Sequence, residues 1–151
     1  TLEQELTALR LYIEMEALRF KQNFNFKIIN SNDIDEEDIK VPPLIIQPFV
    51  ENAIKHGLMH REGEASLIIS TRHFNDALEI KVIDNGIGRV ASEKLKGDLP
   101  LHRSMGIQLT KERILLTDTS GDFIPEVTIN DLYDIDDHPS GTEVTIKLPL
   151  L

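Results

Sequence analysis

The chain of 151 residues contains no cysteine and no tryptophan, and only 5% of its residues are aromatic. Without cysteine it can form no disulfide, thiolate metal site or cysteine nucleophile, which excludes thiol redox chemistry and is compatible with a reducing cytosol. No apolar run approaches the roughly 20 residues that cross a bilayer, and the N-terminus lacks a signal-peptide pattern. We therefore expect this stretch of chain to be soluble.

Positive charge is also scarce. The chain has 16 Lys and Arg against 26 Asp and Glu, a net charge of −10. Such a surface repels a phosphate backbone, so we expect neither nucleic acid nor an anionic membrane as a partner. Hydrophobic residues make up 40% of the sequence, which is enough for the core of one compact domain.

The first 24 residues contain neither Gly nor Pro, and their apolar residues recur at spacings of three and four. This pattern predicts a long amphipathic helix over residues 1–24. A second apolar stripe of Leu11, Met15 and Leu18 lies on another side of that helix. It faces either solvent or another chain, and the sequence leaves both open.

Periodicity and turn residues predict the remaining elements. The segment 31–40 is too acidic to pack and is expected to be a surface loop, and the residues at 73–76 connect an antiparallel hairpin. The elements are a strand at 26–30, a helix at 44–58 that ends at or after Gly57, strands at 65–72 and 77–84, a helix at 105–116, and strands at 126–132 and 142–148. This order predicts an α+β fold, a two-layer α/β sandwich whose mixed, mainly antiparallel sheet is covered on one face by helices, with the long N-terminal helix added.

The helix at 44–58 has one polar face, formed by Glu51, Asn52, Lys55 and His56. An amide oxygen, a cation and an imidazole on one face can coordinate a hydrated hard cation and neutralise phosphate oxygens. A solvated face with a Glu51–Lys55 pair one turn apart is the alternative.

Asp84 ends a strand and is followed by the turn residues NGIG. A carboxylate there can accept a hydrogen bond from an exocyclic amine, while Gly86 and Gly88 let the backbone turn and approach a planar base. The same string is typical of a plain tight turn. Ser104 and Gly106 stand at an expected helix start, where free N–H groups can hold phosphate, and Thr142 precedes the last strand.

The order of these segments resembles a known superfamily. Three segments are similar to the conserved boxes of GHKL ATP-binding domains: PPLIIQPFVENAIKHG to the N box, VIDNGIG to the G1 box and SMGIQLTKERI to the G2 box. Within this superfamily the sequence resembles the LytS/YpdA-like sensor histidine kinases. TLEQELTALRLYIEMEALRF resembles the helix that precedes the ATP-binding domain in that group. The resemblance implies a Bergerat-type fold over residues 25–151 and the end of a dimerisation helix over residues 1–24.

The resemblance also implies roles for particular residues. Asn52 would hold Mg²⁺ between the ATP phosphates, and Lys55 and His56 would contact phosphate or ribose. Asp84 would bind the adenine amino group, with Thr142 beside it.

The glycines and the lid complete the implied site. Gly86 and Gly88 would flank the adenine pocket, and Ser104 and Gly106 would lie at the phosphate end. Residues 89–103 would form the ATP lid. Its candidate phosphate contacts are Lys94, Lys96 and Arg103.

Three departures from the superfamily pattern matter. Gln108 replaces the second glycine of the G2 box, which leaves less room for backbone approach. Pro48 occupies the position of the general-base Glu of the hydrolytic members, so water activation by that route is excluded. Glu51, next to Asn52 in the sequence, is the candidate catalytic group. None of the histidines present has a phosphoacceptor context, so the acceptor is expected outside this sequence.

The function implied is that of the ATP-binding catalytic domain of a two-component sensor histidine kinase, a cytoplasmic domain of an inner-membrane-anchored protein. It would transfer the γ-phosphoryl group of ATP to a histidine outside this chain and from there to a response regulator, with the intact protein a homodimer. Its cofactors would be ATP and Mg²⁺. The alternative is a nucleotide-binding or scaffolding module without phosphotransfer; a hydrolysing ATPase is disfavoured by Pro48 and by the short length.

Overall fold

The computed structural model describes residues 1–20, 24–96, 101–116 and 123–150, with the backbone alone at 96 and 101–105. Five strands form one sheet in the order β1-β2-β3-β5-β4. β1 pairs with β2 in parallel, and the other three pairings are antiparallel. The strands are β1 (Phe24–Asn30), β2 (Ala65–Phe74), β3 (Ala77–Asp84), β4 (Glu126–Tyr133) and β5 (Pro139–Pro149).

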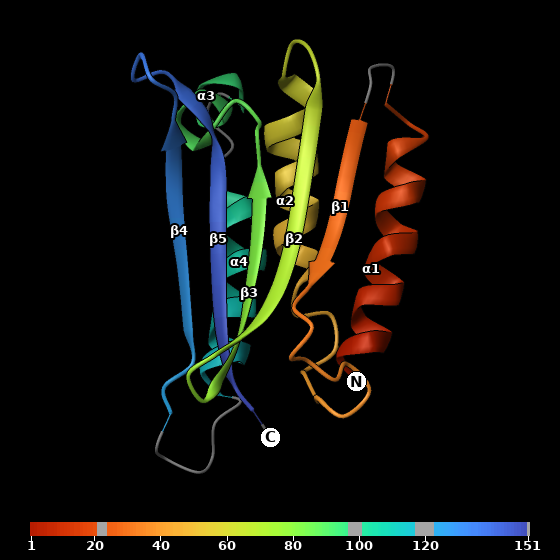
Figure 1. The fold of residues 1–151 in the computed structure, drawn as a ribbon. Helices are drawn as coiled ribbons and strands as arrows, with labels where there is room; N and C mark the ends of the chain where they lie inside the picture. Colours follow the sequence, from red (N-terminus) through yellow and green to blue (C-terminus); the bar gives the residue numbers. More distant parts are fainter. Residues whose placement is uncertain (21–23, 97–100, 117–122, 151) are drawn as a thin grey trace.

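The helices lie mainly on one face of this sheet. Figure 1 shows α2 and α4 against that face and α1 beside β1 at the sheet edge. The helical elements are α1 (Leu2–Ala17), α2 (Gln47–Asn52), a π-helical segment (Ala53–Gly57), a 3₁₀ turn (Leu58–His60), α3 (Arg89–Lys96) and α4 (Leu101–Leu115). The predicted α+β sandwich with a mixed, mainly antiparallel sheet is confirmed. No helix in the described ranges combines the length and apolar composition needed to cross a membrane.

Several predicted boundaries were wrong. The first helix ends at Ala17 instead of continuing to residue 24. Phe24 already belongs to β1, where its ring stacks on that of Phe20 at a centroid distance of 4.9 Å. The spacing of four between these rings thus reflects an aromatic contact between α1's C-terminal flank and β1. The alternation of Phe24 and Phe26 with asparagine is the pattern of a strand.

The helix predicted at 105–116 begins at Leu101 instead. Pro100 directly precedes it in the sequence, and proline is favoured at helix starts. Ser104 and Gly106 are therefore the fourth and sixth residues of α4 and not its first turn. The hairpin connection is also shorter than predicted, because β2 continues through Phe74 and pairs it with Ala77.

The helix α1 belongs to the core of the domain. Leu2, Leu6, Leu9 and Ile13 are buried in the same cluster as the sheet and α2 side chains. The second stripe is exposed, with Leu11 at 57%, Met15 at 61% and Leu18 at 88%. The division at residues 24 and 25 stays a prediction.

The N-terminus of α1 and the segment that follows β1 cap each other. The backbone N–H groups of Leu2 and Glu3 donate to the carbonyls of Ile39 and Glu36, at 2.8 and 3.1 Å. In return, the carboxylate of Glu5 accepts three N–H groups that precede α2, from Leu44 at 2.9 Å, Ile45 at 2.8 Å and Ile46 at 3.2 Å. Ile46 is the N-cap of α2 and offers no side-chain acceptor, so Glu5 supplies the missing cap.

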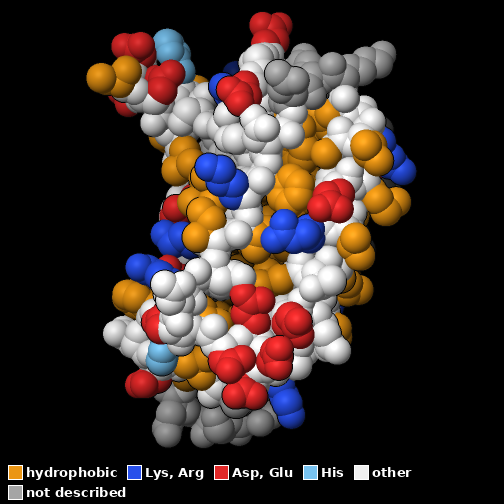
Figure 2. All heavy atoms as spheres, turned by 45° about the vertical axis from the view of Figure 1, so that its right-hand side comes forward, with side chains coloured by type: hydrophobic (Ala, Val, Ile, Leu, Met, Phe, Trp, Pro, Cys, Tyr) orange, Lys and Arg blue, Asp and Glu red, His pale blue; other side chains and the backbone are white. Residues whose placement is uncertain are grey.

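The surface agrees with the acidic composition. Figure 2 shows Asp and Glu side chains gathered at the lower end of one face. A shallow hollow is lined there by acidic residues of α1 and of the loop predicted at 31–40, namely Glu3, Asp33, Asp35, Glu36 and Glu37.

The cap by Glu5 yields a test of stability. Glu5→Gln should lower the free energy of unfolding by about 1–3 kcal/mol, because an amide NH₂ would then face a buried backbone N–H donor. Urea denaturation measures the change. Glu3→Gln, an exposed residue of the same helix, is the control and should change little. Equal stability of the two variants would show that the cap is dispensable.

Candidate functional site

A cavity of about 490 Å³ lies between the helical layer and the ends of β3 and β5. This volume is within the usual range of small-molecule sites. Its walls come from α2 and the π-helical segment, from α3 and α4, and from the three strands β3, β4 and β5. Of the residues predicted from the sequence, those that line it are Asn52, His56, Asp84, Gly88 and Thr142.

Asp84 is the buried acceptor of this cavity. The residue is 5% exposed, and its Oδ1 accepts the N–H of Gly86 at 2.8 Å. Burial raises the pKa of the Asp84 carboxyl to about 6, against the smaller lowering effects of hydrogen bonds from the backbone N–H groups of Gly86 and Thr142. A further donor, such as a ligand amine, would stabilise the ionised form.

Two glycines hold the N-box helix against the G1 turn. A Cβ on Gly86 would lie 2.3 Å from the Cα of Gly57, and a Cβ on Gly57 would lie 2.7 Å from Oδ1 of Asp84. The N–H of Ile87 donates to the Gly57 carbonyl at 3.3 Å. Sequence reasoning took Gly57 only as a helix end. Gly88 does adopt the expected positive φ, of 82°.

Only half of the polar face predicted for this helix faces the cavity. Asn52 and His56 line the cavity, whereas Lys55 and Glu51 do not. Lys55 is half exposed, with its Nζ 3.9 Å from Glu51 Oε2, and Glu51 also accepts from Gln47 Nε2 at 2.8 Å. The alternative Glu51–Lys55 pair is thus observed, and the catalytic role suggested for Glu51 and the ligand role suggested for Lys55 stay predictions.

The G2 string contributes different residues from those expected. Gly106 is exposed, a Cβ there would meet nothing within 4 Å, and it does not line the cavity. Ile107, Gln108 and Lys111 of α4 line it instead. Gln108 Nε2 donates to Glu112 Oε1 at 3.0 Å, one turn further along the helix.

Among the candidate lid cations, the structure describes the side chain of Lys94 alone. Lys94 is exposed on α3 and does not line the cavity. The side chains of Lys96, Arg103 and Ser104 lie outside the described residues. Their assignments as phosphate contacts stay predictions.

Asn85 and Arg89 have structural roles that the sequence did not indicate. Asn85 Oδ1 accepts the N–H of Ser66 at 2.8 Å, which ties the G1 turn to β2. Arg89 lines the cavity but pairs with Asp131, at 2.7 Å from Nε and 2.8 Å from Nη2. This bidentate pair fixes the start of α3 to β4.

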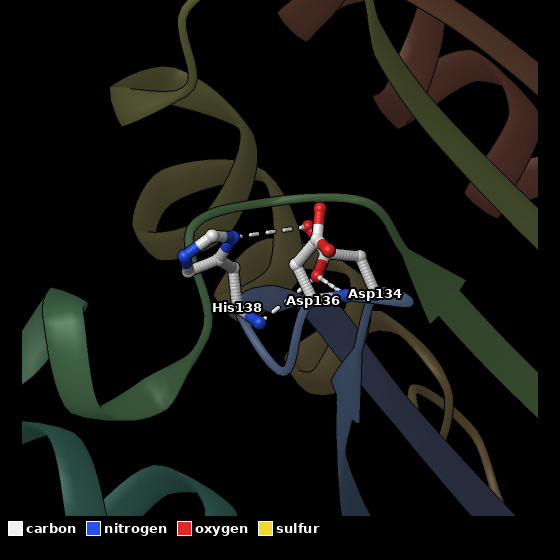
Figure 3. A group of neighbouring side chains, drawn as sticks. All are labelled: Asp134, Asp136 and His138. Carbon is white, nitrogen blue, oxygen red and sulfur yellow. Dashed lines mark hydrogen bonds and ion pairs between the residues drawn. The ribbon is translucent and has the colours of Figure 1, made fainter.

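The connection between β4 and β5 brings together Asp134, Asp136 and His138, shown in Figure 3, with candidate ligand atoms within 4.8 Å of one another. Asp134 Oδ1 accepts the N–H groups of Asp136 and His138, each at 2.9 Å, and Oδ2 lies 3.6 Å from His138 Nδ1. All three residues are exposed. These contacts close the turn by themselves, which agrees with the polar turn predicted from the sequence.

Burial of Asp84 has a measurable cost. Its carboxyl binds a proton more tightly in the folded state, so it favours folding below its usual pKa of 3.8, and this contribution is lost as the pH rises through about 6. The free energy of unfolding of Asp84→Asn relative to the wild type should therefore be about 1–2 kcal/mol higher at pH 8 than at pH 5. Urea denaturation at the two values measures the gain.

Asp76→Asn provides the matched control, because Asp76 is exposed in the turn before β3. It should change stability little at either pH. A gain for Asp84→Asn that does not shrink between pH 8 and pH 5 would contradict the burial argument.

Comparisons with known proteins agree with this geometry. Residues 37–151 match the model of the HATPase_c family, described as histidine kinase-, DNA gyrase B-, and HSP90-like ATPase. The chain is 36% identical over 110 residues to the sensor protein LytS of Staphylococcus saprophyticus, which covers 70% of this chain and 18% of that protein. It is 37% identical over 97 residues to the sensor histidine kinase/phosphatase LytS of Staphylococcus aureus, and this match covers 63% of this chain and 16% of that protein. The chain thus spans less than a fifth of these relatives.

Solved structures show the same fold. The catalytic domain of histidine kinase ThkA matches with a TM-score of 0.64 at 15% identity, over 99% of this chain and 93% of that one. A mycobacterial sensor histidine kinase, MprB, matches with a TM-score of 0.62 at 15% identity, over 96% and 93%. The family model covers the N box, the G1 turn and all five residues predicted from the sequence that line the cavity. The chain therefore belongs to the family of histidine kinase-, DNA gyrase B- and HSP90-like ATPases.

Proposed function

We propose that this chain is the ATP-binding catalytic domain of a sensor histidine kinase and that its cavity binds Mg²⁺–ATP. The observation that carries the proposal is that Asp84 and Asn52 line the same cavity. Asp84 supplies a buried carboxylate acceptor, and Asn52 supplies an amide on a separate wall. A nucleotide offers the matching groups, an exocyclic amine at one end and a metal-bound polyphosphate at the other. Family membership and the LytS relatives support the assignment.

The residues present fit a magnesium ion. Mg²⁺ keeps several waters and is bound by few protein oxygens together with substrate phosphates. The Asn52 side-chain oxygen would be such a ligand, and His56 lines the same wall. When bound, the ion would neutralise phosphate charge.

The side chains of this chain would bind and orient the nucleotide. Asp84 would accept from the adenine amine, with Thr142 paired opposite it across β3 and β5. Pro48 lies in the first turn of α2, where the hydrolytic relatives are expected to have a base, and its side chain would supply no general base there. Catalysis would rest on positioning and charge neutralisation, which suits phosphoryl transfer.

The phosphoryl acceptor and the partners would lie beyond this chain. We propose that the γ-phosphoryl group passes to a histidine elsewhere in the intact protein and then to a response regulator. The intact protein would be a membrane-anchored homodimer with this domain in the cytoplasm.

Removal of the proposed metal ligand should have a metal-dependent effect. Asn52→Ala should weaken ATP binding by about tenfold or more with Mg²⁺, a loss of about 1.4 kcal/mol, and much less when EDTA removes the metal. Calorimetric titration under both conditions measures the two losses. The exposed Asn32→Ala is the control. Equal losses with and without metal would make Asn52 merely structural.

The chain alone should bind ATP but acquire no label from γ-labelled ATP, because it lacks the acceptor. A longer protein that includes the preceding helix should become labelled, and the label should be stable to base and labile to acid. Label on the chain alone would refute the missing acceptor. A longer protein that binds ATP without labelling would favour a nucleotide-binding module without phosphotransfer.

A further inference from the structure

The wall of the cavity formed by α4 contains a cation that the sequence analysis did not assign. Lys111 is half buried and lines the cavity together with Ile107 and Gln108. These residues are three and four positions apart and share one helix face. Thr110 at 4% exposure and Ile114 at 0% bury the neighbouring face, so the orientation of α4 about its axis is fixed by packing.

Lys111 also differs from Arg89, the other cation among the described residues that line the cavity. Arg89 is engaged by both carboxylate oxygens of Asp131. Lys111 forms no ion pair or hydrogen bond with any residue that the structure describes. Its three N–H donors and its charge are therefore available to a ligand.

The cation and the buried carboxylate of this cavity are not in contact. Asp84 and Lys111 form no ion pair, and the groups that lower the pKa of Asp84 are the backbone N–H groups of Gly86 and Thr142, not a lysine. The cavity thus has an acceptor at the end of β3 and a separate cationic position on α4. A ligand with an amine at one end and an anion at the other matches this division.

We infer that Lys111 contacts the polyphosphate of the bound nucleotide. This inference rests on the proposed function and adds a residue to it. Lys111 supplies from α4 the charge that Lys55 and Lys94 do not bring to the cavity, because Lys55 lies against Glu51 and Lys94 is exposed on α3. A lysine suits this role because it acts as a point charge that reaches any oxygen of a phosphate chain.

Lys111→Gln tests the inference through three ligands. Calorimetry should show ATP and ADP binding weakened about tenfold, a loss of about 1.4 kcal/mol, because a charge-assisted contact to phosphate is removed, while adenosine binding is unchanged. Lys111→Arg should restore most of the affinity for ATP. Raising the salt concentration should weaken ATP binding less in Lys111→Gln than in the wild type.

Lys27→Gln is the matched control, because it removes the same charge from an exposed lysine of β1 outside the cavity. It should leave all three affinities unchanged. Circular dichroism checks that Lys111→Gln is folded, and Lys111→Met, which keeps the apolar stem, replaces it if it is not.

The outcomes separate the two proposals. A wild-type chain that binds neither ATP nor adenosine would overturn the proposed function. A wild-type chain that binds ATP, with Lys111→Gln unchanged or with adenosine and ATP weakened equally, would overturn the role of Lys111 alone. Equal losses in Lys111→Gln and Lys27→Gln would show a general charge effect and would also overturn it.

Discussion

The contact between the backbones of Gly57 and Gly86 determines the geometry of the whole site. With no side chain on either residue, the end of the N-box helix reaches the turn that follows β3, at distances that any Cβ would occupy. This contact brings the helix wall that carries Asn52 and His56 next to Asp84 at the end of β3, so that all three line one cavity. A side chain at either glycine would force the helix away from the strand, and the amide and the carboxylate would no longer face one ligand.

Stability and binding oppose each other at Asp84 but not elsewhere in the site. Burial of Asp84 disfavours the ionised form of its carboxyl group, which is the form that accepts best from a ligand amine. Lys111 and Gln108 are placed by the buried Thr110 and Ile114 without being buried themselves. Asp84 is thus buried at one end of the cavity, whereas the α4 wall presents partly exposed polar groups, which suits a ligand with an apolar ring and hydrated phosphates.

The sequence predicted those features that depend on local patterns. The bounds of β3 are as expected, and β2 begins where expected. Burial alternates along the first part of β2, and both strands are rich in the β-branched residues that favour strands. Asp84 and Asn52 line the cavity as predicted, because each lies in a motif that can be recognised from its sequence neighbours. The first helix was predicted too long because Phe20 and Phe24 fit a helical spacing as well as a ring stack. The π-helical form of residues 53–57 and the place of Lys111 in the cavity wall depend on packing between distant segments, which local sequence patterns do not reveal.

The reciprocal capping of α1 and the segment before α2 makes these two helices one cooperative folding unit. α1 donates its first N–H groups to carbonyls at residues 36 and 39, and through Glu5 it accepts those of residues 44–46. Neither helix end can open without leaving polar groups of the other unpaired. A chain that began at residue 25 would expose the apolar side chains that α1 covers and would deprive the N box of its cap. The smallest fragment that folds with an intact site therefore starts at or before α1.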